Sequence, residues 1–115
     1  MPPLRLITVV ETKPYLAMIG ELIDEAGRIA LVNRFAADPE AGDLIPETGG
    51  LRKLRVALPG RGKRGGGRVI TYFHDLEMPV FLIAFYAKSR QSDLNAQQRK
   101  AAKAATDAIR AQYGR

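Results

Sequence analysis

The sequence contains no cysteine, a single histidine and no long apolar run. Without cysteine the chain can form neither disulfides nor thiolate metal sites, and a reducing cytoplasm is the setting we expect. The longest apolar run beyond the N-terminal segment, residues 79–87, is far shorter than the roughly 20 residues of a transmembrane helix. The N-terminal segment, MPPLRLITVVETK, has no small-residue cleavage site, so it indicates a strand rather than a signal peptide. We therefore expect no membrane partner.

The same scarcity excludes several kinds of catalytic centre. His74 is the only histidine, so a ribonuclease site built on paired histidines cannot form. No clustered His, Asp and Glu pattern indicates a metal site, and we expect no cofactor. The sequence has no Gly-x-Ser-x-Gly motif and no P-loop, and residues 60–68 match no phosphate-binding glycine fingerprint. Lysine, arginine and tyrosine remain as the chemically useful side chains.

Positive charge is concentrated in one segment. Acids are missing between Glu47 and Asp75, and residues 49–68 hold seven of the 11 glycines. The same residues include seven cations: Arg52, Lys53, Arg55, Arg61, Lys63, Arg64 and Arg68. Residues 1–50 carry four basic and eight acidic side chains, and the rest of the chain carries 14 and four. Unpaired positive charge repels itself unless a polyanion relieves it, so we expect a basic face for RNA and a second face for another partner.

The N-terminal half predicts a strand followed by helix. Residues 4–10 are rich in β-branched side chains and predict a strand. Residues 13–37 carry an apolar stripe at helical spacing, with a break between residues 20 and 27 and Asp24 as a cap for a second helix. The Asp38-Pro39 pair ends the helix, and residues 41–50 are expected to form a loop.

The C-terminal half predicts a run of strands and a last helix. Strands are expected over residues 51–58, 68–73 and 80–87, the last apolar on both faces and suited to the centre of a sheet. Residues 95–112 predict a helix with a capping box from Asn95 and Gln98, and we expect it to pack weakly because Ile109 is its only large aliphatic residue. This order predicts one α+β domain over residues 1–115: a small, mainly antiparallel sheet with helices against one face.

Lysines and arginines can cut RNA because the substrate supplies its own nucleophile. The ribose 2′-OH attacks the adjacent phosphate, while the protein orients it, neutralises charge and moves protons. Arginines bind phosphate bidentately, and a lysine crowded by other cations, such as Lys53 or Lys63, could act as general base. Lys53 and Arg55 share one strand face, and in a meander Arg68 and Lys88 would reach the same groove. The alternative is that these charges only steer binding, and composition alone favours it.

Two stretches of the sequence resemble a known family of bacterial toxins. The strings FAADPEAGDLIPETGGLRKLRVALPGRGKRGGGRVITYFHD and PVFLIAFYAKSRQSDLNAQQRKA are similar, in several ordered blocks, to the RelE/HigB group of type II toxin–antitoxin modules. The similarity is closest to the HigB-like branch of the RelE/ParE superfamily, with its NPxxGDxIxGTGGLRKxR, GKxGGxRxIYY and YAKNE-like patterns. The resemblance implies a small antiparallel sheet packed against N-terminal helices. It also implies a ribosome-dependent mRNA endonuclease, neutralised by a cognate antitoxin that is often a helix-turn-helix DNA-binding protein.

The resemblance assigns roles to individual residues. Arg68 falls on the family's sheet arginine, which is expected to hold the scissile phosphate. Lys53, Lys63 and Lys88 complete the expected catalytic set. The expected RNA contacts are the other cations of these blocks and one tyrosine, which in the family is a core or base-stacking residue: Arg52, Arg55, Arg61, Arg64, Arg90 and Tyr86.

The chain departs from the family pattern at four places. Glu47 replaces the first glycine of the GTGG motif, which affects the turn, and Gly67 is smaller than the residue usual before the sheet arginine. Thr71 replaces a common tyrosine, which removes a stacking or proton-transfer group, and Ser89-Arg90 replaces Asn-Glu and adds a cation.

Three functions stay open at this point. The first is an mRNA interferase acting in the ribosomal A site, which the density of Lys and Arg at sheet positions favours. The second is a non-cleaving, ParE-like toxin that binds and poisons a protein target such as gyrase. The third is a plain RNA- or ribosome-binding domain. The acidic N-terminal half and the last helix are either antitoxin surfaces or parts of the domain's own core, and the two interpretations weigh equally.

Overall fold

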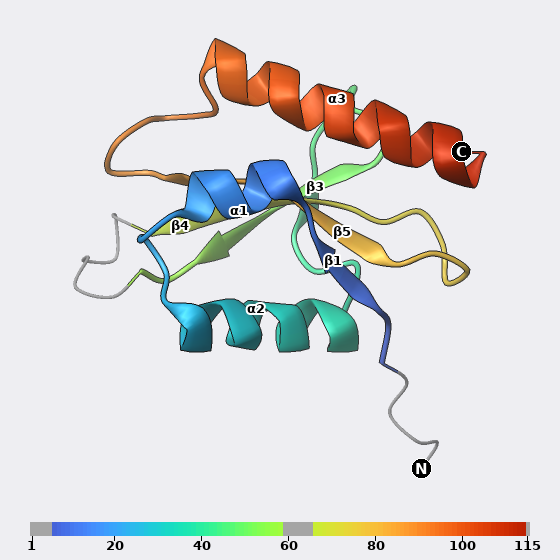
Figure 1. The fold of residues 1–115 in the computed structure, drawn as a ribbon, viewed down its shortest axis with the longest axis horizontal. Coiled ribbons are helices and arrows are strands. Elements are labelled where there is room, and N and C mark those ends of the chain that lie inside the picture. The colour runs from blue at the N-terminus through green and yellow to red at the C-terminus, as the bar shows by residue number, and fades with distance from the viewer. Residues whose placement is uncertain (1–5, 59–65, 115) are drawn as a thin grey trace.

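Five strands form a sheet in the order β1-β5-β4-β3-β2, shown in Figure 1. The computed structural model describes residues 6–58 and 66–114. The strands are β1 Val9–Glu11, β2 Asp43–Leu44, β3 Leu51–Val56, β4 Gly67–Tyr72 and β5 Val80–Ala87, and the helices are α1 Lys13–Ile19, α2 Glu25–Ala37 and α3 Ala96–Tyr113. Only β1 pairs parallel, with β5; the other pairs are antiparallel. The predicted α+β class and mainly antiparallel sheet are confirmed.

The helical half of the chain breaks where the sequence predicts. α1 ends at Ile19 and α2 begins after Asp24, whose carboxylate accepts a 2.8 Å hydrogen bond from the Gly27 N–H. α2 ends at Ala37, before the Asp-Pro pair. Two predicted ranges were wrong. Within the described residues, the strand predicted over residues 4–10 covers only β1, Val9–Glu11. The loop predicted over residues 41–50 contains the short strand β2.

The helices cover both faces of the sheet, which corrects the expectation that they lie against one face. Tyr15 of α1 and Phe35 of α2 pack with Val69, whereas Ile109 of α3 packs with Ile70. Because neighbouring strand residues point to opposite faces, the two clusters lie on opposite sides of β4. Figure 1 shows α2 below the sheet and α3 above it. Every residue of β5 is buried, as a strand covered on both faces requires.

The last helix contacts the rest of the domain through residues other than Ile109 as well. The capping box is confirmed: the Asn95 side chain accepts from the Gln98 N–H at 2.8 Å, and the Gln98 side chain accepts from the Asn95 N–H at 3.0 Å. Polar and aromatic residues supplement Ile109: the Tyr113 ring meets Phe81 edge-on at 5.9 Å, and Arg110 reaches the sheet. No helix in the described part of the chain has the length and hydrophobicity to cross a membrane.

Candidate functional site

Pairing of the strands brings three predicted site residues into one row. Arg55 of β3 lies directly opposite Arg68 of β4, and Arg68 lies opposite Tyr86 of β5. Alternation along β3 puts Lys53 on the same face as Arg55, and the Lys53 Nζ lies 5.7 Å from the centre of the Tyr86 ring. We call Lys53, Arg55 and Arg68 the basic row, and the Tyr86 ring lies beneath it. The row lies at the left of Figure 1, where β3 and β5 end and β4 begins.

Two glycines set the position of Arg68. A Cβ on Gly67 would overlap the ring of Phe85, and a Cβ on Gly66 would lie 2.7 Å from the Val56 carbonyl oxygen. Only glycine therefore lets β4 start this close to its neighbours. The small residue before Arg68, a departure from the family pattern, is explained by the space that Phe85 occupies. The Arg68 Nη1 donates to the Gly67 carbonyl at 3.1 Å, and the other guanidinium N–H groups have no acceptor among residues 6–58 and 66–114.

A further cation, Lys88, follows the end of β5 and is hydrogen-bonded through its backbone to the residue before β4. The Lys88 backbone N–H donates to the Gly66 carbonyl at 3.0 Å, so Lys88 is tied to the start of β4. Its Nζ donates to the Ser92 carbonyl at 3.2 Å and is exposed. Arg90 is exposed in the turn that follows, where its backbone N–H donates to the Ala87 carbonyl.

Some predicted site residues are not part of this arrangement. Arg52 alternates to the opposite face and donates to Glu40, with its side chain 18% exposed. Tyr86 is 2% exposed beneath Lys53, so it belongs to the core and presents no open ring for base stacking. Thr71 is buried and its alternation with Ile70 places it on the face away from the row; the tyrosine it replaces would not lie at this site. Three residues lie outside the described part of the chain: Arg61, Lys63 and Arg64.

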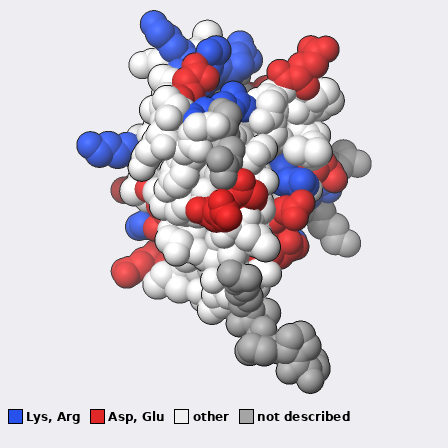
Figure 2. Space-filling view, turned by 90° about the vertical axis from the view of Figure 1, so that its right-hand side faces the viewer, with Lys and Arg blue, Asp and Glu red and all other residues white. Residues whose placement is uncertain are grey.

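The structure gives the cations of the basic row no acidic partner within residues 6–58 and 66–114. Within the described residues, none of the ion pairs includes Lys53, Arg55 or Arg68. The same residues contain no group of three or more His, Cys, Asp or Glu that could hold a metal ion. The opposite end of the molecule, seen in Figure 2, shows basic and acidic side chains interspersed with uncharged surface. The row is therefore suited to bind an anion such as an RNA phosphate.

A groove beside the row includes residues that sequence reasoning missed. It has a volume of about 430 Å³ and lies between α3 and the turn of residues 45–50. Lys53 of β3 and Ile70 of β4 line it from the sheet. From α3 it is lined by Arg99, Ala102, Lys103, Thr106, Asp107 and Arg110. These residues recur every three or four positions, so helical periodicity could have identified this face.

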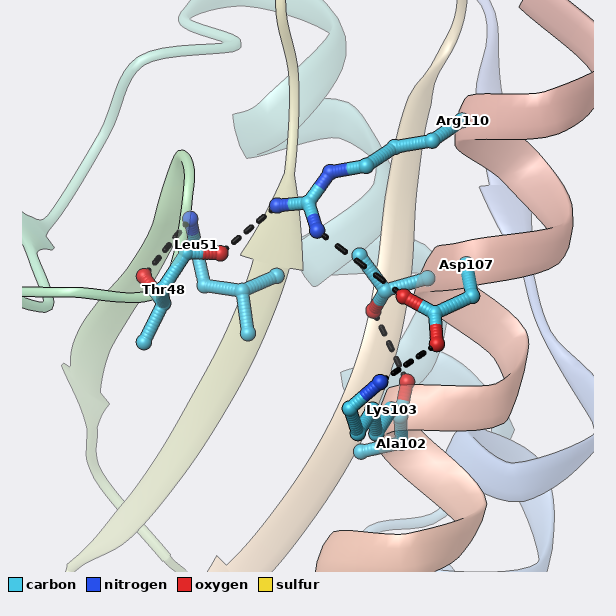
Figure 3. A network of polar contacts seen from close by, with 7 residues as sticks. Thr48, Leu51, Ala102, Lys103, Asp107 and Arg110 are labelled. Atoms are coloured by element: carbon cyan, nitrogen blue, oxygen red, sulfur yellow. Dashed lines mark hydrogen bonds and ion pairs between the residues drawn. The ribbon is translucent and has the colours of Figure 1, made fainter.

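Arg110 holds α3 to the turn that forms the other wall of the groove. Its Nη2 donates to the Thr48 carbonyl at 2.6 Å, and its guanidinium carbon lies 5.1 Å from the centre of the Tyr72 ring. Figure 3 shows this arginine reaching across from the helix, with Asp107 between it and Lys103. The Thr48 hydroxyl in turn accepts from the Leu51 N–H at 3.2 Å and closes the turn.

Two comparisons identify relatives of the chain. A family model described as the RelE toxin of the RelE/RelB toxin–antitoxin system matches residues 33–113. Among solved structures, the free state of a double mutant of the E. coli toxin RelE superposes with a TM-score of 0.55 and 13% identity, over 84% of this chain and 94% of that chain. At this identity, the structural likeness shows the shared fold.

Proposed function

The chain belongs to the RelE family of toxins of toxin–antitoxin systems, and we propose that it is a ribosome-dependent mRNA endonuclease of the HigB-like branch. The observation that supports cleavage is the basic row, where Lys53, Arg55 and Arg68 share an open part of the sheet without acidic partners among the described residues. A toxin that only bound a protein would not need this concentration of phosphate-binding side chains in one row.

The proposed reaction uses the RNA's own hydroxyl as nucleophile. The 2′-oxygen forms a bond to phosphorus, the bond to the 5′-oxygen breaks, and the products are a 2′,3′-cyclic phosphate and a 5′-hydroxyl. Arg68 and Arg55 hold the phosphate oxygens, where charge grows in the transition state. One lysine takes the 2′-OH proton and another supplies a proton to the 5′-oxygen; Lys53, Lys63 and Lys88 are the proposed candidates.

Primer extension on mRNA from cells that briefly express the chain without antitoxin tests this proposal. Cuts confined to translated frames are expected, and Arg68→Ala should reduce them about 10²- to 10³-fold, the usual effect of removing one preorganised charge-stabilising donor. Lys100→Ala, which removes an exposed cation of α3 outside the row and outside the lining of the pockets beside it, is the matched control and should cut normally. Arrested growth with intact mRNA would replace the nuclease by a ParE-like protein-binding toxin. Intact mRNA with normal growth would indicate an RNA-binding domain.

We also propose the setting in which the activity is restrained. The chain is a single domain acting in the cytoplasm, bound by a cognate antitoxin of the helix-turn-helix DNA-binding class. Its net charge of +6 favours both an acidic antitoxin and the ribosome's RNA. Co-purification with the product of the neighbouring gene, and loss of mRNA cutting when both are expressed, test this pairing.

A further inference from the structure

The groove beside the basic row has the composition of a binding site for a small, flat, polar-edged group. Its floor includes the apolar side chains of Leu51, Ile70 and Leu94. Charged residues of both signs surround this floor: Glu47, Lys53, Asp93, Arg99, Lys103, Asp107 and Arg110. Its volume of about 430 Å³ lies in the range of small-ligand sites. An apolar floor with a few polar groups at the edge is how such sites fix the orientation of a ligand.

Most polar groups of the rim are already used within the protein. Lys103 and Asp107 pair at 2.6 Å, and Arg110 donates to Thr48. Arg99 Nη1 donates to the Leu94 carbonyl at 2.8 Å, and the Asp93 carboxylate accepts from the Leu94 N–H at 2.8 Å. These contacts shape the rim and leave few of its groups for a ligand.

Glu47 is the exception. Glu47 is exposed and lines the groove, and within the described residues its carboxylate has no hydrogen-bond or ion-pair partner. Its φ of 63° lies in the left-handed region that residues with a side chain avoid, and it is the one such non-glycine residue in the described chain. Backbone conformations of this kind concentrate at functional sites, where the surrounding structure maintains them.

We propose that the groove receives one unpaired base of the RNA whose phosphate lies on the basic row, and that Glu47 selects bases that carry an amino group. The proposal rests on the RNA-cleaving function proposed above. Lys53 belongs to both the row and the groove, so a phosphate on the row places the adjoining base at the groove. The faces of a base fit an aliphatic floor, and its edge meets the rim.

The chemistry of the four bases predicts the selection. Adenine, cytosine and guanine each present an amino group, which donates to a carboxylate. The pairing edge of uracil presents one N–H between two carbonyl oxygens, and those oxygens are repelled by the charge of Glu47. Uracil is therefore the base that the groove disfavours.

Titration of the ¹⁵N-labelled chain with the four ribonucleoside 3′-monophosphates, followed by NMR, tests this inference. Amide shifts are expected at Leu51, Ile70 and Leu94, with the amino-bearing nucleotides binding about tenfold more tightly than the uridine nucleotide, as one hydrogen bond to a charged group predicts. Glu47→Gly, which suits the left-handed backbone, should remove this preference, because the amino-bearing nucleotides lose a hydrogen bond and the uridine nucleotide loses a repulsion. Glu21→Gly, in the exposed connection between α1 and α2, is the matched control and should retain the preference.

Three results would overturn the inference. Equal affinity for all four nucleotides would remove the selection by Glu47, and shifts confined to Arg55, Arg68 and Lys88 would remove the base pocket. Groove amides that respond to purified antitoxin but to no nucleotide would make the groove a protein-docking surface. Because a 3′-monophosphate has no bond to cleave, selective binding would support the pocket even if mRNA stayed intact in cells.

Discussion

Replacing Arg110 by alanine is expected to lower the free energy of unfolding by about 2 kcal/mol. The hydrogen bond from its guanidinium to the Thr48 carbonyl, at 2.6 Å, involves a charged donor and contributes roughly 1.5 kcal/mol. The cation–π contact with Tyr72, at 5.1 Å, adds about 0.5 to 1 kcal/mol. The Asp107 pair at 4.0 Å adds little, because it is an exposed contact at the limit of an ion pair.

Thermal unfolding followed by circular dichroism measures this effect. With an unfolding entropy of about 2.1 cal/mol/K per residue, 2 kcal/mol corresponds to a fall in Tm of roughly 8 °C for a chain of 115 residues. Lys103→Ala is the control on the same helix, because its exposed pair with Asp107 should shift stability by less than about 0.5 kcal/mol.

A double-mutant cycle isolates the contact with the sheet. Arg110→Ala and Tyr72→Leu should be non-additive by about 0.5 to 1 kcal/mol, the size of a cation–π contact. Additive effects, or an Arg110→Ala variant as stable as Lys103→Ala, would show that α3 is held by its apolar contacts alone and that Arg110 does not fasten the groove wall.

Three further changes test the packing that positions the site. Gly67→Ala should cost about 1 to 3 kcal/mol because its Cβ overlaps the Phe85 ring, and urea denaturation should show part of this loss recovered in the Gly67→Ala/Phe85→Leu double variant. Burial, with a smaller effect of Glu11, raises the pKa of the Tyr15 hydroxyl. The unfolded chain therefore releases that proton first, and stability should fall as pH rises past about 10. Tyr15→Phe should lessen this alkaline loss and, since the hydroxyl has no hydrogen-bond partner among the described residues, should not destabilise the chain at neutral pH. Asn95→Ala should cost about 1 kcal/mol through loss of the helix cap, measured by the same urea titration.

Local sequence patterns correctly predicted the helix boundaries that depend only on residues close together in the sequence. The helix break before Asp24 and the capping box at Asn95 are each formed within four residues of chain, so the pattern and the structure agree. The extent of β1 was not predictable in the same way, because it forms only where Val9 meets Val80 across the sheet. β2 exists for the same reason: Asp43 and Leu44 pair with β3.

The candidate site was predictable in part. Alternation placed Lys53 and Arg55 on one face, and the structure adds that strand register sets Arg68 opposite Arg55. The same alternation could have separated Arg52 from this set, since it is one position from Lys53. The burial of Tyr86 beneath Lys53 depends on three strands at once, and no local pattern contained it.

The amino-acid sequence by itself determined the class of fold, the segment that carries the positive charge and the family resemblance, because these follow from short-range periodicity, composition and ordered motifs. Only the tertiary structure decided which cations form one row, that both faces of the sheet are covered, and that Glu47 faces a groove under α3. The physical reason is that register and helix docking are set by contacts between residues far apart in the chain, where the side chains must fit together.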